Sequence, residues 1–267
     1  MSNTALSYAA LQRELTRRSF AAMIVDGPGG SLIFVWALGA ATFIVLLGTP
    51  LLIVPLTVAA AVIGVRTFRE YAQDPVVLAR VLPRVVRDLY AAPGVSDRSL
   101  MALLEHGQQL FVEIVLKIGR STRGETHPGR ALLIRQALEM VLFQRDLARQ
   151  ATESARVLEL VSQTPAGSGS LIATNTAAMR RQADHSVAIM YEIIEQLEVF
   201  LLQITQLGGS NLDAAQAAES ARQARESLEQ MQVEVTTRQA MADRLFADLA
   251  TPAPNKRISD DRIEKGH

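Results

Sequence analysis

The hydrophobic pattern of the chain is dominated by one uninterrupted apolar run. Residues 31–65 contain no charged side chain. A helix of about 20 apolar residues crosses a bilayer, so this run is long enough for two short passes. At its centre, Gly48, Thr49 and Pro50 combine a helix-ending glycine with a helix-starting proline. The pattern predicts a two-pass membrane hairpin over residues 31–65, with arms at 31–47 and 51–65.

The flanking charges predict the orientation of this hairpin. Arg13, Arg17 and Arg18 precede the run and Arg66 and Arg69 follow it, whereas the central turn has no basic residue. By the positive-inside rule, we expect a multi-pass protein of the cell (inner) membrane with both termini in the cytoplasm.

Two other interpretations of the apolar run stay open. Because each arm is short, the run also fits a re-entrant wedge that enters one leaflet only. The adjacent Arg17 and Arg18 resemble a twin-arginine export signal, although Asp26 and the glycine-rich segment 27–30 interrupt its path to the apolar run.

Residues 1–30 are predicted to be a cytoplasmic amphipathic helix and a linker. Within residues 5–25, apolar positions such as Leu11, Leu15 and Met23 recur at a spacing of three or four. The stripe does not reveal whether it contacts the cytoplasmic leaflet or the helices of the protein itself.

Residues 66–163 are predicted to form a juxtamembrane helical region. Asp74 and Pro75 indicate a helix start, and Ser96 is expected to cap a helix that ends near Gly119. Pro128 is expected to open the next helix, which carries a seven-residue repeat with two polar interruptions. The repeat positions are Leu133, Ala137, Met140, Gln144, Leu147, Ala151, Ser154, Leu158 and Val161.

Residues 171–250 predict a long antiparallel coiled-coil hairpin. Gly208 and Gly209 end its first arm, and Ser210 to Asp213 have the form of a capping box for the second. Residues 251–267 predict a disordered tail. The repeat positions are Met179, Ala183, Ser186, Met190, Ile193, Leu197, Phe200, Ile204 and Leu207 in the first arm, and Ala214, Ala217, Ala221, Ala224, Leu228, Met231, Val235, Arg238, Ala242, Leu245 and Leu249 in the second.

Charged side chains suggest two candidate contact sites. Arg80, Arg84 and Arg87 form a basic stripe on one helix, suited to lipid headgroups or to solvent. Arg238 is the polar member of its repeat, and antiparallel pairing brings it within about a turn of Asp184, so this pair is a candidate for fixing the register. The alternative is an Arg238 head group that reaches solvent.

Composition narrows the functional classes. Acidic and basic residues balance at 27 each, and aromatic residues make up 5%, which argues against nucleic-acid binding. There is no cysteine, and therefore no disulfide or thiolate site. The four histidines form no metal-ligand motif, and no phosphate loop or nucleophile elbow occurs. We therefore expect no catalytic, cofactor-binding or metal-binding residue, and no enzymatic activity.

These features predict an all-α protein: a membrane helical hairpin, then a helical bundle, then the coiled-coil hairpin. The expected function is a membrane-anchored scaffold or adaptor that self-associates or holds a helical protein partner at the cytoplasmic face of the bilayer. Membrane shaping by a wedge hairpin, or a small oligomeric channel or transporter subunit, are the alternatives.

Overall fold

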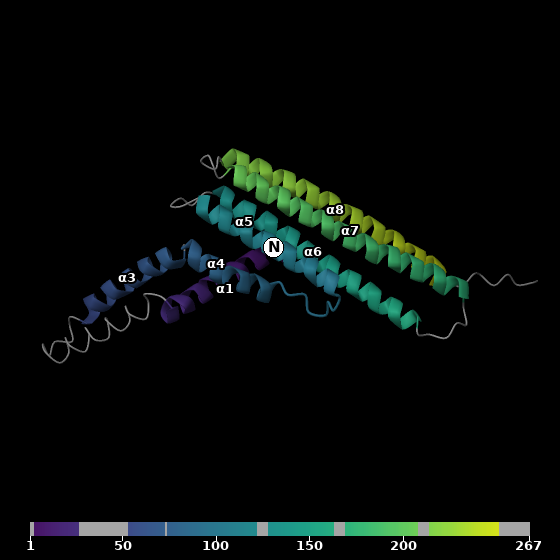
Figure 1. Ribbon diagram of the computed structural model, residues 1–267, viewed down its shortest axis with the longest axis horizontal. Coiled ribbons are helices and arrows are strands. Elements are labelled where there is room, and N and C mark those ends of the chain that lie inside the picture. The colour runs from purple at the N-terminus through teal and green to yellow at the C-terminus, as the bar shows by residue number, and fades with distance from the viewer. Residues whose placement is uncertain are drawn as a thin grey trace, which may run out of the picture.

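The computed structural model describes residues 3–26, 53–72, 74–121, 128–162, 169–207 and 214–250. These residues form seven α-helices and no strand, which confirms the all-α prediction. The helices build an elongated bundle, with α5 to α8 along its length and α1, α3 and α4 beside it (Figure 1). Their bounds are α1 (Asn3–Asp26), α3 (Ile53–Ala72), α4 (Pro75–Leu89), α5 (Arg98–Ser121), α6 (Pro128–Ser162), α7 (Gly169–Leu207) and α8 (Ala214–Ala250).

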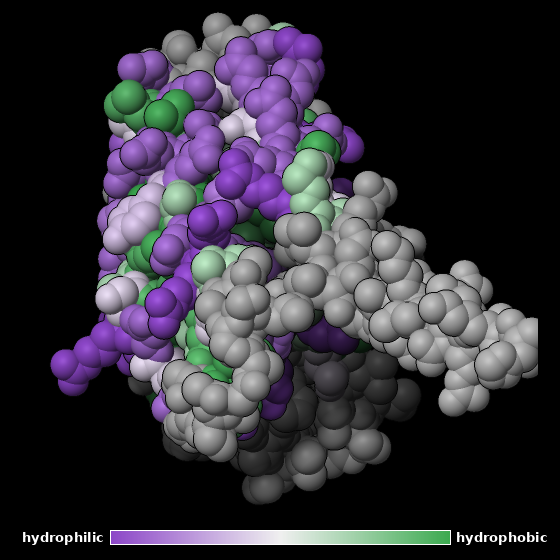
Figure 2. All heavy atoms as spheres, turned by 90° about the vertical axis from the view of Figure 1, so that its right-hand side faces the viewer, coloured by the Kyte–Doolittle hydropathy of each residue, from purple (hydrophilic) through white to green (hydrophobic). Residues whose placement is uncertain are grey.

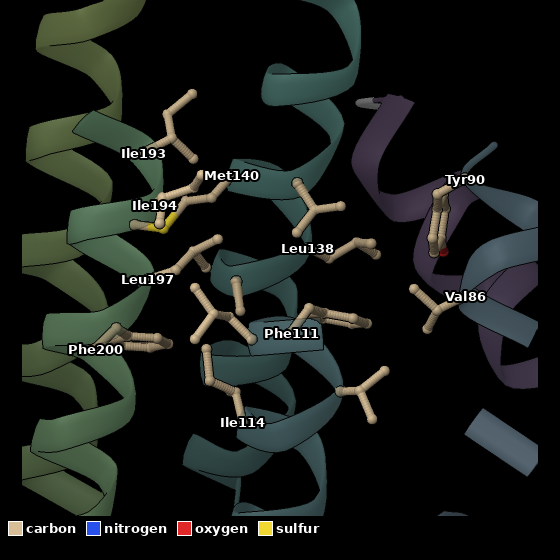
Figure 3. Packing of buried hydrophobic residues seen from close by; sticks show 14 of the residues in the cluster. Val86, Tyr90, Phe111, Ile114, Leu138, Met140, Ile193, Ile194, Leu197 and Phe200 are labelled. Atoms are coloured by element: carbon tan, nitrogen blue, oxygen red, sulfur yellow. The ribbon is translucent and has the colours of Figure 1, made fainter. Parts of the chain in front are cut away.

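The core lies where α5, α6 and α7 meet. In Figure 3, Leu197 and Phe200 of α7 point toward Phe111 of α5 and Met140 of α6. The same buried cluster continues to α4 and α1 on one side and to α8 on the other. Helices α6 and α7 share the most extensive contacts, and both α5 and α8 pack on this central pair.

The seven-residue repeats mark the buried faces over the central stretch of each of the three long helices, whereas the outer repeat positions Leu158, Val161, Met179 and Ala183 are only partly buried. In α6 the repeat positions from Leu133 to Ser154 are buried, in α7 those from Ser186 to Ile204, and in α8 those from Ala221 to Met231. Beyond Met231, Val235 is only partly buried and Arg238 is exposed. Among the coloured side chains in Figure 2, most are hydrophilic, and the hydrophobic ones lie in small separate patches.

Polar caps explain where α4 and α5 begin. The carboxylate of Asp74 accepts a hydrogen bond of 2.8 Å from the backbone N–H of Val76, as expected for the predicted helix start. Helix α5 is capped by Asp97, whose carboxylate accepts a bond of 2.6 Å from the backbone N–H of Ser99. The predicted cap, Ser96, lies one residue too early.

Helix α1 packs on the helices of the protein itself, which answers the question left open by its amphipathic stripe. Tyr8, Leu11 and Met23 are buried. Arg18 of α1 forms an ion pair of 2.8 Å with Asp88 of α4.

The predicted multi-pass membrane anchor requires correction. Among the described residues, no helix is both long enough and apolar enough to cross a membrane. Helix α3 contains residues 53–65 of the second predicted arm, and this uncharged part covers only about 20 Å of the ~30 Å hydrocarbon layer. The same helix continues through Arg66 and Glu70, which form an exposed ion pair of 3.2 Å. This finding overturns the predicted multi-pass localisation.

Several predicted features lie outside the described residues. They are the first arm at 31–47, the turn at Gly48 to Pro50, the glycine pair at 208–209 with the capping box at 210–213, and the tail at 251–267. The membrane-shaping and channel hypotheses depend on the predicted hairpin, and the described residues give them no support.

Candidate interaction groove

A long hollow runs along α6, between α8 and the start of α1. Its volume is about 920 Å³. We call it the α6–α8 groove. It is lined by Ser7 of α1, by Leu132, Arg135, Gln136, Glu139, Leu142, Phe143, Arg145 and Asp146 of α6, and by Ala218, Ala221, Arg222, Arg225, Leu228, Glu229 and Gln232 of α8.

Helix geometry explains why α6 forms the floor of this groove. Leu132 and Gln136 each precede a core position of the repeat by one residue, and are therefore rotated by about 100° from the core face. Leu142 and Phe143 are partly buried and pack against the edge of the core, whereas Leu132 is 44% exposed. The groove floor therefore has apolar side chains at both ends of its α6 segment, with the polar Gln136 and Glu139 between them.

Helix α8 forms one wall. Ala221 and Leu228 are buried against the bundle, and the neighbouring Arg222, Arg225 and Glu229 are exposed. The wall therefore has small and apolar side chains at its base and charged side chains at its rim. From Ala218 to Gln232 it follows about four helical turns, the same length as the floor from Leu132 to Asp146.

The start of α1 closes the opposite side and is fixed by two tyrosines. The guanidinium of Arg135 lies 5.0 Å from the ring centroid of Tyr8, a cation–π arrangement. The hydroxyl of Tyr90 donates a hydrogen bond of 3.2 Å to the carbonyl oxygen of Ser7. Burial raises the pKa of Tyr90 to about 12.

The rim charges are paired within single helices. Arg222 contacts Glu219 at 2.7 Å and Glu226 at 3.2 Å, and Arg225 contacts Glu229 at 2.7 Å. Hydrogen bonding from Arg222 lowers the pKa of Glu219. All these side chains remain exposed, so the pairs are easily rearranged and a partner can offer them alternative contacts.

The side-chain nitrogen of Gln136, in the groove lining, lacks a hydrogen-bond partner among the described residues. Its side chain is buried, with 4% exposure, and its amide nitrogen Nε2 has no hydrogen-bond acceptor among the described residues. Buried polar groups of proteins are nearly always paired, because an unpaired one loses its hydration without compensation. The groove floor therefore contains a buried hydrogen-bond donor, Nε2 of Gln136, that has no acceptor among the described residues.

The predicted basic stripe lies in a different groove. Arg84 and Arg87 of α4 line a hollow of about 390 Å³ together with Glu105 and Glu113 of α5. Arg80 is exposed on the same helix. The nearby carboxylates give Arg84 and Arg87 an intramolecular source of opposite charge, and contact of the stripe with lipid headgroups remains a prediction.

The predicted register pair, Arg238 with Asp184, is not brought together as an ion pair. Arg238 instead contacts Glu234 of its own helix at 2.8 Å, and its side chain is 58% exposed. Asp184 is exposed and forms no ion pair with a described residue. The position of Arg238 thus agrees with the alternative, in which its head group reaches solvent.

Two histidines connect α7 to its neighbours. His106 of α5 and Glu198 of α7 approach to 3.3 Å on the surface. Nε2 of His185 is buried 3.6 Å from a carboxylate oxygen of Glu234, without a hydrogen bond to any described residue. Burial, and then the charge of Arg238, lower the pKa of His185. Within the described part of the chain, no three His, Asp or Glu side chains converge to hold a metal ion.

The groove itself was not predicted from the sequence. The repeats identify one buried face on each helix, and the groove lies beside those faces. A signal was present: Leu132, Leu142 and Phe143 are apolar but lie outside the predicted repeat of α6. No family model, no curated protein and no solved structure matches the chain, so the groove is interpreted from its own residues alone.

Proposed function

We propose that the protein is a non-enzymatic helical scaffold or adaptor whose task is to hold another helix in the α6–α8 groove. The observation that carries this proposal is the match between the groove and an α-helix. Its floor on α6 and its wall on α8 both follow about four turns, with lining positions at helical spacing.

The composition of the lining supports a helix rather than a small molecule. The groove is long and partly open, and its lining alternates apolar side chains such as Leu132 and Phe143 with charged ones such as Glu139. Apolar and charged side chains that alternate at helical spacing suit an amphipathic helix, which presents both kinds of side chain along its length. Small-molecule sites, by contrast, are mostly enclosed and bury most of the ligand.

Site-specific photocrosslinking in living cells tests the proposal. Ala218 is exposed on the groove wall, so a photoreactive amino acid at this position is expected to crosslink to a protein chain. The matched control is Ala188, an exposed alanine of α7 outside the groove, which is expected to give no comparable product. Absence of any protein adduct at Ala218, or equal adducts at both positions, would contradict the proposed function.

A substitution that fills the groove provides a second test. Ala218→Trp places a large side chain in the space that a docked helix needs, without changing a core position. The adduct or complex detected at the groove is expected to disappear in this variant and to persist in Ala188→Trp. Circular dichroism spectra of both variants should match the wild type.

A further inference from the structure

We propose that the helix held in the α6–α8 groove is α8 of a second copy of this chain, lying antiparallel to the first α8 about a two-fold axis between positions 225 and 226. This inference rests on the proposed function, because it names the partner that the groove receives. It predicts a symmetric dimer in which each copy supplies one groove and one inserted helix.

The charge pattern of α8 is self-complementary about this axis. Arg222 and Arg225 precede the midpoint, and Glu226 and Glu229 follow it. An antiparallel partner places Arg222 opposite the partner's Glu229 and Arg225 opposite the partner's Glu226. A parallel partner would instead place Arg222 and Arg225 against the same positions of the second copy, which brings like charges together.

The side chains at the base of the wall permit close approach of a second helix. Ala218 and Ala221 are small, and the distance between packed helix axes, typically about 8–10 Å, depends on the side chains at the contact. Ala218 itself is exposed, whereas Leu228, near the other end of the wall, is buried in the bundle. A second α8 can therefore enter the groove without displacing the core of the first copy.

The existing ion pairs on α8 do not compete strongly with this arrangement. The ion pairs of Arg222 and Arg225 with described residues join carboxylates of their own helix, and all of these side chains are exposed. When two copies meet, the same guanidinium groups can contact carboxylates of both chains at once. Exclusion of water from the interface strengthens such contacts relative to the free surface.

The unpaired amide of Gln136 is consistent with an arriving polar helix. The groove face of α8 carries Glu229 and Gln232, whose side-chain oxygens are hydrogen-bond acceptors. A second α8 brings the same acceptors over the floor of the groove, where Gln136 has a buried donor and no described acceptor.

Charge reversal in the full-length protein tests this dimer. Arg222→Glu places a carboxylate opposite the partner's Glu229, and Glu229→Arg places two guanidinium groups opposite each other. Sedimentation equilibrium is expected to give a dimer for the wild type, with the dimer Kd raised by about tenfold or more in each single variant. Arg180→Glu, an exposed reversal on α7 outside the groove, should leave the Kd unchanged.

Mixing the two single variants provides the decisive measurement. In a mixture of Arg222→Glu and Glu229→Arg, every cross-chain contact again joins opposite charges, so a heterodimer is expected to form where neither variant dimerises alone. Circular dichroism of each variant confirms that folding is intact. A monomeric wild type at micromolar concentration, or a mixture that fails to form the heterodimer, would overturn the proposed dimer.

The cysteine-free sequence allows an independent check. Arg225→Cys places one thiol per chain beside the predicted axis, so mild oxidation is expected to give a disulfide-linked dimer, whereas Arg180→Cys should form no disulfide between the chains. A crosslink from Ala218 to a different protein, with no self-adduct, would overturn the second copy as occupant while supporting the proposed scaffold function. Absence of any adduct would contradict both.

Discussion

Gln144 of α6 occupies the space that a side chain on Gly107 of α5 would need. A Cβ atom built on Gly107 would meet the side-chain oxygen of Gln144 at a distance that real atoms do not adopt. Gln144 is fully buried, and its amide nitrogen donates a hydrogen bond of 3.0 Å to the carbonyl oxygen of Leu103. Gln144, which interrupts the apolar repeat of α6, therefore packs against Gly107 of α5. Together the two residues specify how α5 lies on α6.

Gly107→Ala is expected to destabilise the protein by about 1–3 kcal/mol, because the new methyl group must displace a buried amide in a packed interface. Gly119 provides the matched control, since the nearest atom to its Cβ position is a side-chain nitrogen of Arg130 at 3.7 Å. Gly119→Ala should be neutral or stabilise the helix by roughly 0.5–1 kcal/mol. Chemical denaturation measures both values, and equal effects of the two substitutions would contradict the fit between Gly107 and Gln144.

Phe200 and Leu202 of α7 should respond very differently to truncation. Phe200 is 1% exposed and faces the core, whereas Leu202 is 57% exposed. Phe200→Ala is expected to lower the free energy of unfolding by about 3–5 kcal/mol, whereas Leu202→Ala should change it by no more than about 0.5 kcal/mol. Urea denaturation compares the two. A loss below about 1 kcal/mol for Phe200→Ala would show that α7 does not pack on α5 and α6 as described.

The ion pair between Glu234 and Arg238 should be measurable as a small coupling. A double-mutant cycle of Glu234→Ala and Arg238→Ala is expected to give roughly 0.3–0.5 kcal/mol, since both side chains are exposed and four residues apart. The cycle of Asp184→Ala with Arg238→Ala should give no coupling by thermal melting. A coupling in the second cycle and none in the first would restore the register pair expected from the sequence.

His185 should make stability depend on pH. Because its pKa in the folded state is lowered from 6.5 by burial and by Arg238, the unfolded chain binds a proton more readily than the folded chain. Its contribution to stability is therefore fully present above about pH 6.5 and is lost as the pH falls toward the folded-state pKa.

Denaturation of the wild type and of His185→Gln, at about pH 7.5 and about pH 5.5, measures this effect. The wild type should lose more stability than the variant on acidification. The region where Glu234 and Arg238 of α8 lie beside His185 of α7 is expected to loosen first, as measured by hydrogen exchange. An identical loss in both proteins would show that His185 stays neutral, or titrates equally, in the folded and unfolded states.

The sequence by itself determined the helical class, most helix boundaries and the buried faces of the long helices. These features depend on local signals: Pro75 and Pro128 at helix starts, and the repeat through Met140, Leu197 and Leu228, which a helix must place on one side. Such signals act within a few residues of the chain, so they can be recognised before the arrangement of the helices is known.

Only the tertiary structure decided which helix faces meet and which surfaces stay uncovered. The repeat of α7 did not indicate that its most extensive contacts are with α6, because an apolar stripe does not specify its neighbour. For the same reason the surface covered by α1 and the α6–α8 groove were not predictable. Each depends on residues from helices far apart in the sequence, and hydrophobic burial, which drives their packing, carries no direction of its own.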